Sequence, residues 1–256
     1  MSTVQPAPLE PSSVELADIV AARPRPLLVG LDVDGVLAPI VERADRAALL
    51  PGVTEALLDL VPHVTLAVVS GRSVADLEAR YGFPAGVTVV GSHGLETRGL
   101  DTVALDEREQ RRLDDLTALA SAAADAAGAG AWVEHKPASI VLHVREADHA
   151  TAEPAATRLH QRAGEVPGAH VKHGHEVVEL MVRPTSKATA VADLRARHGA
   201  ATVVFVGDDR TDEEVFATLA PGDVSVRVGP GETLAAHRLP DPPAVLAWLR
   251  ALPSRL

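Results

Sequence analysis

The feature that most limits how this chain can fold is a series of short, wholly apolar segments that alternate with helical stretches. Three of these segments come early, at residues 27–31, 64–70 and 87–91, and a fourth begins at residue 201. Strands that are apolar throughout are buried on both faces, and strands connected by helices run parallel. The sequence therefore predicts an α/β fold, in which a Rossmann-like parallel sheet is covered by helices on both faces.

The helices of this predicted core have recognisable capping residues. Ser73 is suited to begin the helix after the second strand, and Gly82 to end it. Gly199 is suited to end a later helix. After the fourth strand, Thr211 and Glu214 have the spacing of a capping box, which predicts that a helix starts there.

The pattern changes in the middle of the chain. A long helical stretch begins near residue 106, and segments that alternate polar and apolar residues follow in pairs, first WVEHK with SIVLHVR and later AHVKH with EVVELMV. This order suits a small antiparallel sheet with helices on one face and the other face open. The simplest organisation has three parts: an N-terminal tail of residues 1–25, a discontinuous catalytic core domain of residues 26–96 and 184–256, and an inserted α+β cap domain of residues 97–183.

Composition excludes several classes of function. The formal net charge is -11, and an acidic surface repels nucleic acid and anionic membranes. The chain has no cysteine, so it forms neither a disulfide framework nor a thiolate metal site. Its first residues are polar and rich in proline, unlike a signal peptide, and no apolar run is long enough to span a membrane. We therefore expect a cytoplasmic protein that binds neither nucleic acid nor membrane.

Polar residues gather where the predicted core strands end. Asp32 and Asp34 follow the first strand, Ser70 ends the second, Asp208 follows the fourth, and Lys187 lies where a helix starts. Ligands of open α/β sheets bind beyond the carboxyl ends of the strands, so these side chains should form one acidic cluster with a lysine and a hydroxyl. Carboxylate ligands suit Mg²⁺, whose charge would offset the repulsion between the acids.

Such a cluster also suits phosphoryl transfer. A carboxylate can attack phosphorus and form an aspartyl-phosphate, while the metal ion and Lys187 balance the charge on the transferring group. Ser70 and nearby backbone N–H groups would hold the phosphoryl oxygens. The second carboxylate, two residues after the first, could protonate the leaving alcohol and then deprotonate the attacking water.

The order of four motifs resembles that of the haloacid dehalogenase-like phosphatases; the motifs are DVDGVL, VVSGR, Lys187 and VGDDRTDE. Within that superfamily the sequence resembles the trehalose-6-phosphate phosphatases, through GSHGLE, VEHKPASIVLHVR, EVVEL and GDDRTDEEVF. The resemblance covers most of residues 27–220 and implies a haloacid dehalogenase-like core with an inserted cap. It also implies a Mg²⁺-dependent phosphatase whose substrate is a small-molecule sugar phosphate, trehalose 6-phosphate.

The resemblance assigns a role to each polar residue of the core. Asp32 would be the nucleophile and Asp34 the general acid and base, while Ser70 would contact the phosphoryl group and Lys187 would steady the nucleophile and the phosphate. Mg²⁺ would be held by the Asp32 carboxylate, the Asp34 backbone carbonyl and Asp208. The supporting residues, acting through water or through Lys187, would be Asp209 and Asp212.

Strand alternation provides a separate indication for the cap. In SIVLHVR, the apolar residues Ile140, Leu142 and Val144 share one face, and the other face carries Ser139, Val141, His143 and Arg145. In WVEHK, the side chains of Glu134 and Lys136 share one face. A sheet face with these side chains suits sugar hydroxyls, and we expect it to close over the acidic cluster and exclude water. With two residues of the core included, the expected substrate-binding residues are Gly71, Arg72, Glu134, Lys136, His143, Arg145 and Glu179.

The sequence departs from the family pattern in three places that bear on the substrate. Ala188 stands where the family usually has glycine, and Val144 stands where an aromatic residue is usual. The stretch ELMVRPTSK differs from the short ExRP form of the family, so the resemblance assigns no role to Arg183. A second hypothesis is therefore a phosphatase for another sugar phosphate, of the sucrose-phosphate or mannosyl-phosphoglycerate type.

Two hypotheses come from other classes of protein. A signalling receiver domain also uses an aspartate, Mg²⁺, a hydroxyl and a lysine, but it has its paired acids after the first strand and its phosphorylated aspartate after the third. In this chain a DxDG motif follows the first strand, the GDD motif comes late, and a large insert is present. A catalytically inactive regulatory domain is opposed by the intact aspartates and lysine of the cluster. The sequence is also compatible with a functional link to a trehalose-6-phosphate synthase.

Overall fold

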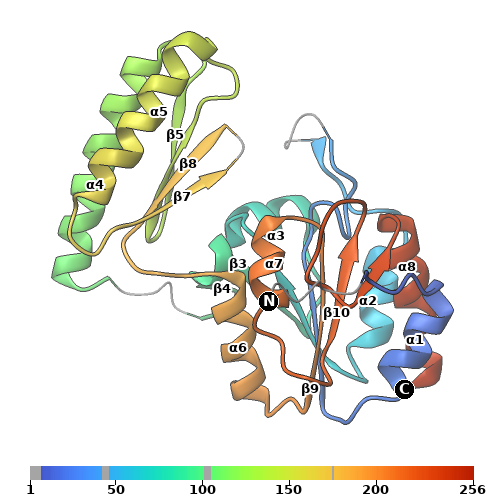
Figure 1. Ribbon diagram of the computed structural model, residues 1–256. Helices are drawn as coiled ribbons and strands as arrows, with labels where there is room; N and C mark the ends of the chain where they lie inside the picture. Colours follow the sequence, from blue (N-terminus) through green and yellow to red (C-terminus); the bar gives the residue numbers. More distant parts are fainter. Residues whose placement is uncertain (1–6, 42–45, 101–104, 175) are drawn as a thin grey trace, which may run out of the picture. The chain divides into compact units, whose positions relative to one another are not determined.

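The computed structural model of the chain describes residues 7–41, 46–100, 105–174 and 176–256. The chain divides into two compact units, of which the first is Met1–Gly99 with Ser186–Leu256 and the second is Leu100–Thr185 (Figure 1). The second unit thus runs from residue 100 to residue 185, in the part of the chain where the sequence analysis placed an inserted domain of residues 97–183.

The first unit is built on a seven-stranded sheet. Its strands lie in the order β11-β10-β9-β1-β2-β3-β4, and neighbours pair in parallel except β3 and β4, which are antiparallel. The strands are β1 (Leu27–Leu31), β2 (Thr65–Val69), β3 (Val87–Gly91), β4 (Glu96–Thr97), β9 (Thr202–Gly207), β10 (Val224–Val228) and β11 (His237–Leu239). Because β9, β1 and β2 are neighbours and parallel, the loops that follow them lie side by side at one edge of the sheet.

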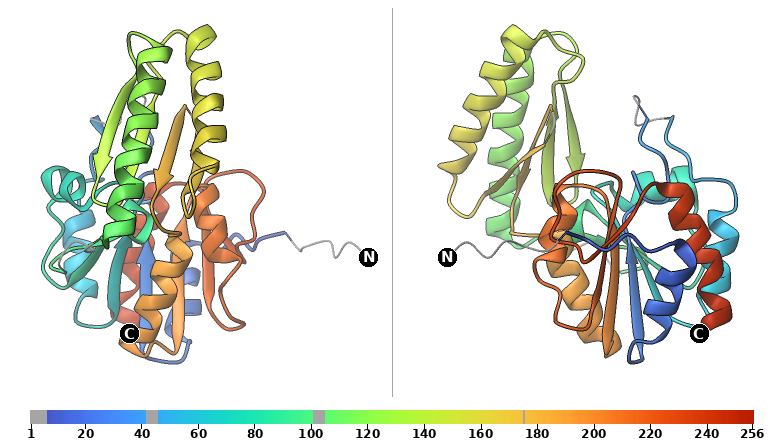
Figure 2. Two further views of the ribbon diagram at one scale, coloured as in Figure 1. Left: turned by 90° about the vertical axis from the view of Figure 1, so that its left-hand side faces the viewer. Right: turned by 45° about the vertical axis from the view of Figure 1, so that its right-hand side comes forward.

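Helices cover both faces of this sheet (Figure 2). Strand alternation sends Val29 and Val204 into the hydrophobic core shared with α1, α2, α3 and α8, whereas Leu28 and Phe205 enter the core shared with α6 and α7. This arrangement confirms the predicted α/β fold. The helices are α1 (Ser13–Ala21), α2 (Val53–Leu60), α3 (Val74–Tyr81), α6 (Lys187–His198), α7 (Arg210–Phe216) and α8 (Pro242–Ala251), with the 3₁₀ helices η2 (Ser92–Gly94) and η3 (Pro253–Arg255).

Three of the predicted helix caps are confirmed. The Ser73 side chain accepts a hydrogen bond from the backbone N–H of Asp76 at the start of α3. Gly82 and Gly199 end α3 and α6 in the left-handed conformation, which glycine adopts without steric cost. Strands β4 and β11, which the sequence analysis did not predict, are the shortest of the sheet and lie at its edges.

The N-terminal segment contributes to the core of the first unit. Helix α1 begins with a capping box between Ser12 and Glu15 and buries Leu16, Ala17 and Val20. It packs against α8, which comes from the other end of the chain. The stretch that the sequence analysis set apart as a tail therefore includes a helix of the core, and its first six residues lie outside the described ones.

The second unit is an antiparallel sheet with two helices. Its strands lie in the order β5-β6-β8-β7, and α4 packs on α5 and on β6. Ile140 and Leu142 share a face with their partners Leu180 and Val178, and all four are buried, so this is the apolar face on which the helices pack. The elements are α4 (Glu107–Ala127), β5 (Trp132–Lys136), β6 (Ser139–His143), α5 (His149–Gly164), β7 (His170–Gly174) and β8 (Val177–Met181).

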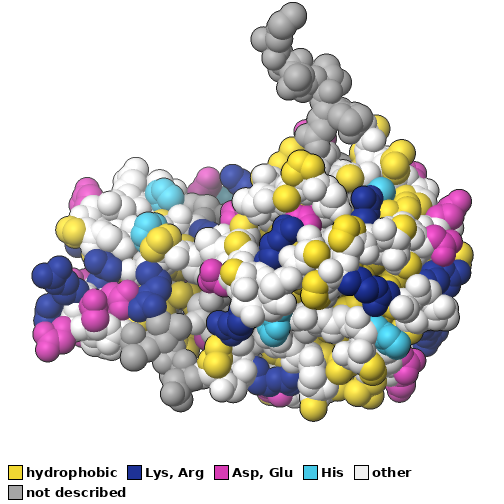
Figure 3. Space-filling model, turned by 90° about the horizontal axis from the view of Figure 1, so that it is seen from below, with side chains coloured by type: hydrophobic (Ala, Val, Ile, Leu, Met, Phe, Trp, Pro, Cys, Tyr) yellow, Lys and Arg dark blue, Asp and Glu magenta, His cyan; other side chains and the backbone are white. Residues whose placement is uncertain are grey.

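Among the helices that the structure describes, none combines the length and the apolar character that a membrane crossing requires. In the view of Figure 3, basic and acidic side chains are interspersed over the described surface.

The packing of α1 predicts a large effect of shortening a buried side chain there. Leu16→Ala should lower the free energy of unfolding by about 2–5 kcal/mol, because it removes a fully buried side chain and leaves a cavity. Val14→Ala, in the same helix, should change it by less than about 0.5 kcal/mol, because Val14 is 49% exposed. Urea unfolding followed by circular dichroism measures both. Equally small effects would show that α1 does not belong to the core.

Candidate active site

The loop after β1 brings the first two predicted acids to the edge of the sheet. Asp32 is buried, and its Oδ1 accepts a hydrogen bond of 2.7 Å from the backbone N–H of Val33. Gly35, three residues on, has φ +77°, and a Cβ at that position would lie 2.1 Å from the Oδ2 atom of Asp208. The Asp208 carboxylate therefore packs directly against the backbone of this loop, which leaves no room for any residue but glycine.

Lys187 connects an acid of the loop after β1 with an acid in the first turn of α7. The side chain starts α6 and is 1% exposed, and its Nζ lies 2.8 Å from Asp32 Oδ2 and 2.9 Å from Asp212 Oδ1. Burial by itself would lower the pKa of Lys187, but the charges of Asp212 and Asp32 outweigh burial and raise it. The lysine is therefore a buried cation that neutralises part of the acidic cluster.

The loop after β9 is organised by a capping box that differs from the predicted one. Asp209 is the N-cap of α7, and its Oδ1 accepts hydrogen bonds from the backbone N–H groups of Thr211 and Asp212. Asp212 Oδ2 in turn accepts from the N–H groups of Asp208 and Asp209. The prediction of a box between Thr211 and Glu214 was wrong, because Asp209 caps as well as threonine, has the same spacing to Asp212, and comes first.

The acids of the cluster are in an environment that favours a bound cation. Burial raises the pKa of Asp32 well above its ordinary value, and the nearby acids Asp212, Asp209 and Asp208 raise it further against the opposing charge of Lys187. Burial, followed by the charges of Asp212 and Asp209, raises the pKa of Asp208 to about 7. Both shifts come first from burial and then from negative charge that the lysine alone does not compensate.

The donor set can hold a metal ion. Oxygen atoms of Asp32, Asp209 and Asp212 all lie within 4.8 Å of one another. Asp208 is outside that group, but none of the described residues donates a hydrogen bond to its carboxylate, which faces Gly35 of the neighbouring loop. Carboxylates so arranged suit a hard divalent cation.

One residue of the loop after β2, Arg72, holds Asp34. Ser70 is buried, and its Oγ accepts a hydrogen bond from the backbone N–H of Arg72. Arg72 holds the Asp34 carboxylate with both Nε (2.6 Å) and Nη2 (2.8 Å), and its Nη1 lies 2.9 Å from Asp76. A Cβ at Gly71 would lie 2.8 Å from the ring of His93, so the chain has little space there. Arg72, expected to bind substrate, thus binds Asp34 in this structure.

The register of the second unit places most of the predicted cap residues on one face. Glu134 is opposite Val141, which is opposite Glu179, and Lys136 is opposite Ser139 in the neighbouring row. Strand β6 ends at His143, so the expected continuation of the strand to Arg145 was wrong. Arg145 lies in the turn that follows, where its Nε is 3.2 Å from Glu176.

The polar side chains of this face bind one another. Lys136 Nζ is 3.3 Å from Glu179 Oε1, and the Ser139 hydroxyl donates a 2.9 Å hydrogen bond to the same oxygen. His143 Nε2 is 2.9 Å from Glu134 Oε2. Sequence reasoning missed Ser139, although the alternation that placed His143 on this face places Ser139 there as well.

The predicted site residues thus form two groups, one in each unit. The group of the first unit is Asp32, Asp34, Ser70, Gly71, Arg72, Lys187, Asp208, Asp209 and Asp212. The group of the second unit is Glu134, Lys136, His143 and Glu179, with Arg145 beyond the end of its strand.

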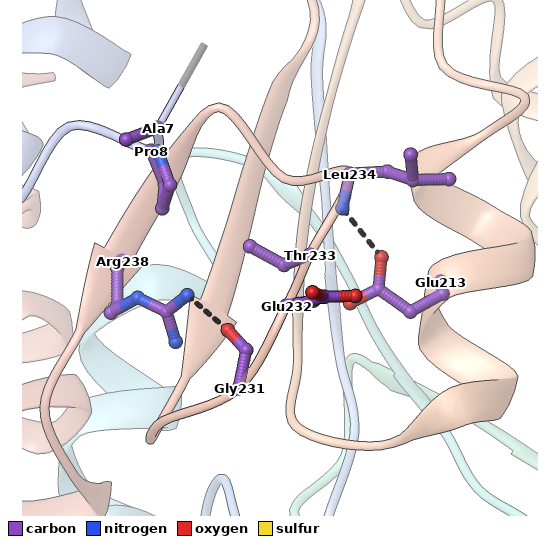
Figure 4. Close-up of a pocket in the computed structure, with 8 residues that line it drawn as sticks. All are labelled: Ala7, Pro8, Glu213, Gly231, Glu232, Thr233, Leu234 and Arg238. Carbon is purple, nitrogen blue, oxygen red and sulfur yellow. Dashed lines mark hydrogen bonds between the residues drawn. The ribbon is translucent and has the colours of Figure 1, made fainter. Parts of the chain in front are cut away.

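A cavity of about 560 Å³ in the first unit contains none of the predicted residues (Figure 4). Two of its charged side chains bind the protein's own backbone: Glu213 accepts a 2.7 Å hydrogen bond from the N–H of Leu234, and Arg238 donates one of 2.6 Å to the carbonyl of Gly231. The cavity therefore does not compete with the acidic cluster as the candidate active site.

The first unit has an aspartate pair after its first strand, and one member of the pair binds a buried lysine. Its mostly parallel sheet is formed by two stretches of the chain, which an α+β unit separates in the sequence. These features place the chain among the haloacid dehalogenase-like phosphatases. A family model described as trehalose-phosphatase matches residues 30–237, which is most of the chain. The chain therefore belongs to the trehalose-phosphatase family.

Curated relatives agree with this family. The chain is 34% identical over 244 residues to a trehalose-6-phosphate phosphatase of Escherichia coli, with 88% of this chain and 86% of that protein covered. It is 32% identical over 249 residues to a trehalose-phosphate phosphatase of Mycobacterium marinum, with 91% and 63% covered. It also matches an uncharacterized glycosyl hydrolase of Mycobacterium tuberculosis at 34% identity, with 88% of this chain but 18% of that protein covered. The chain thus spans less than two thirds of two of these three proteins.

Solved structures share the fold. The C-terminal domain of a Candida albicans trehalose-6-phosphate phosphatase aligns with a TM-score of 0.76 at 23% identity, with 98% of this chain and 100% of that chain covered. The C-terminal domain of a Candida albicans trehalose synthase regulatory protein aligns with a TM-score of 0.75 at 12% identity, with 96% and 100% covered. At these identities the likeness concerns the fold alone.

The raised pKa of Asp208 predicts how the stability of the metal-free protein depends on pH. The folded state binds this proton more tightly than the unfolded state, so the contribution to stability is complete below the ordinary pKa of 3.8 and is lost as pH rises through about 7. In a chelator such as EDTA, the Tm should therefore fall between about pH 4 and pH 7 and level off above pH 7, and Asp208→Asn should make that fall smaller.

Calorimetry at several pH values tests this expectation. The matched control is Asp59→Asn, an exposed aspartate of α2, which should leave the slope of Tm against pH unchanged. An Asp208→Asn protein with the wild-type slope would contradict the explanation.

Proposed function

We propose that the chain is a Mg²⁺-dependent phosphatase that hydrolyses trehalose 6-phosphate to trehalose and phosphate through an aspartyl-phosphate intermediate. The observation that carries the proposal is the buried contact of Lys187 with Asp32 and Asp212, at 2.8 and 2.9 Å. Membership of the trehalose-phosphatase family and the relative in Escherichia coli, of which the chain covers 86%, support the substrate.

Asp32 is the proposed nucleophile. Its carboxylate is held from two sides, by the backbone N–H of Val33 at Oδ1 and by Lys187 at Oδ2. Both contacts orient the carboxylate, and the lysine favours its charged, nucleophilic form. When a phosphoryl group is transferred to Asp32, the same lysine is placed to balance the charge on the phosphoryl oxygens.

Mg²⁺ is the proposed cofactor, held by the Asp32 carboxylate, the Asp34 backbone carbonyl and Asp208. Asp208 is the best suited of the remaining acids, because its pKa is raised to about 7 and no described residue donates a hydrogen bond to its carboxylate. Asp209 caps α7 and Asp212 binds Lys187, so these two support the site. The bound ion would supply charge stabilisation for the transferring phosphoryl group.

Asp34 is the proposed general acid and base. Its carboxylate is more exposed than that of Asp32, with 33% of the side chain accessible, and Arg72 holds both of its oxygens. The proposed role of Arg72 therefore includes holding Asp34 in a fixed orientation, in addition to contact with substrate. Ser70 and Gly71, at the end of β2, are the proposed contacts of the phosphoryl oxygens.

The polar face of the second unit is the proposed sugar-binding surface. Glu134, Lys136, His143 and Glu179 share this face and would bind sugar hydroxyls, and Arg145 would contribute from the adjoining turn. We propose that the second unit closes over the acidic cluster as a cap during turnover.

The rival hypotheses have different support. The fold also occurs in a regulatory protein of Candida albicans, so the fold by itself does not establish catalysis. The intact contacts of Asp32, Asp34 and Lys187 favour an active enzyme over an inactive domain. The inserted second unit disfavours a receiver domain. The cytoplasmic location and the functional link to a trehalose-6-phosphate synthase stay predictions from the sequence.

Phosphate release from a panel of sugar phosphates tests the proposed function. Trehalose 6-phosphate should be hydrolysed faster than sucrose 6-phosphate and glucose 6-phosphate, only when Mg²⁺ is present, and Asp32→Asn should lower kcat by about 10³-fold or more. Equal rates on all three substrates would contradict the assigned specificity. No release by folded wild-type protein would contradict the phosphatase.

The Asp34–Arg72 contact predicts a selective effect on turnover. Arg72→Lys should lower kcat about tenfold with little change in KM, because lysine cannot hold both oxygens of Asp34. Steady-state kinetics on trehalose 6-phosphate measures both parameters. Arg195→Lys is the control, since Arg195 binds Asp223, which Arg72 does not contact. A raised KM with unchanged kcat would instead assign Arg72 to substrate binding.

A further inference from the structure

Trp132 is a half-exposed aromatic side chain in a chain that has few of them. The sequence contains two tryptophans, one tyrosine and three phenylalanines. Trp248 and the three phenylalanines are buried, whereas Trp132 is 51% exposed at the start of β5. Leaving an indole in water forgoes the stabilisation that its burial would contribute, so this position calls for an explanation outside the packing of the core.

The exposed indole is held rigidly on one side. Trp132 pairs with His143 in the register of β5 and β6, and the two rings stack with centroids 3.9 Å apart and planes 2° apart. His143 is itself fixed by Glu134, whose Oε2 lies 2.9 Å from His143 Nε2. The stack orients the indole before any ligand binds, which lowers the entropy cost of binding to its other side.

Charged and hydrogen-bonding groups begin in the next row of the same sheet face. Residues two apart on a strand point to the same side, about 7 Å from each other, so Glu134 lies one row from Trp132 and Lys136 lies two rows away. Across the strands, Glu179 is in the row of Glu134 and is bound by Lys136 and Ser139. The face thus presents an aromatic plane beside carboxylate and ammonium groups.

This arrangement matches the chemistry of a sugar ring. A pyranose has apolar faces made of C–H groups and an edge of hydroxyls, so it can lie on an aromatic plane while its edge forms hydrogen bonds. A phosphate group would be a poor occupant of the same position, because Glu134 is an acid directly beside the indole. The neutral sugar is therefore the part of a sugar phosphate that fits.

We propose that Trp132, backed by His143, is a stacking platform for one hexose ring of the substrate, and that it determines specificity for a glycoside over a simple monosaccharide phosphate. The inference rests on the proposed sugar-phosphate substrate. It adds a residue to the sugar-binding surface that the motif resemblance does not assign.

Kinetics of variants provide the first test. Trp132→Ala should raise KM for trehalose 6-phosphate about tenfold with kcat within about twofold, and Trp132→Phe should have a smaller effect because it keeps a ring. Glucose 6-phosphate turnover should change little in either variant. The matched control is Leu58→Ala, since Leu58 is an apolar side chain of the first unit that is 48% exposed. A Trp132→Ala enzyme with unchanged KM would overturn the proposal.

Fluorescence of the full chain provides a test that does not depend on turnover. Titration of wild-type protein with trehalose should shift its tryptophan emission, and Trp132→Phe should abolish that shift because only the buried Trp248 remains. Inorganic phosphate, as the control, should cause no shift. Absence of a Trp132-dependent shift with trehalose, sucrose and glucose would overturn the platform.

The two tests also separate this proposal from the proposed function. If wild-type protein releases no phosphate from trehalose 6-phosphate, the proposed function fails. A Trp132-dependent shift with a sugar would support the platform in that case too, since sugar binding requires no hydrolysis.

Discussion

The site depends on the buried ion pairs that Lys187 forms with Asp32 and Asp212. The lysine starts α6 and joins the loop after β1 to the first turn of α7, so three segments that are far apart in sequence meet at one ammonium group. A buried charge without partners costs several kcal/mol, and the same holds for the carboxylates that it contacts. Each group is tolerated in the interior because the others are there, and this mutual requirement fixes the orientation of Asp32.

The two aspartates of the β1 loop acquire different environments from their partners. Asp32 is buried against Lys187, while Asp34 is more exposed and is held by Arg72 from the end of β2. These different surroundings support the different roles proposed for two identical side chains only two residues apart, because a carboxyl group takes its chemical role from its surroundings. Gly35 completes the loop, since a larger residue would collide with Asp208.

The second unit illustrates how strand register selects a surface. The pairing of β5, β6 and β8 places Glu134, Lys136 and Glu179 on one face, and the same pairing places Trp132 against His143. The hydrophobic side chains on the other face anchor this register, because a shift by one residue would bury the charges and expose the apolar residues. The polar surface is thus a consequence of how the apolar face packs.

The sequence by itself determined the α/β fold, the positions of most strands and helices, and the gathering of acids at strand ends, because these depend on local periodicity and on the rules of parallel sheets. It did not determine the partners within the cluster. That Arg72 holds Asp34, that Asp209 rather than Thr211 caps α7, and that β6 stops before Arg145 were decided by tertiary structure. Those outcomes depend on which side chains meet across loops and strands, and contacts between distant residues leave no local pattern in the chain.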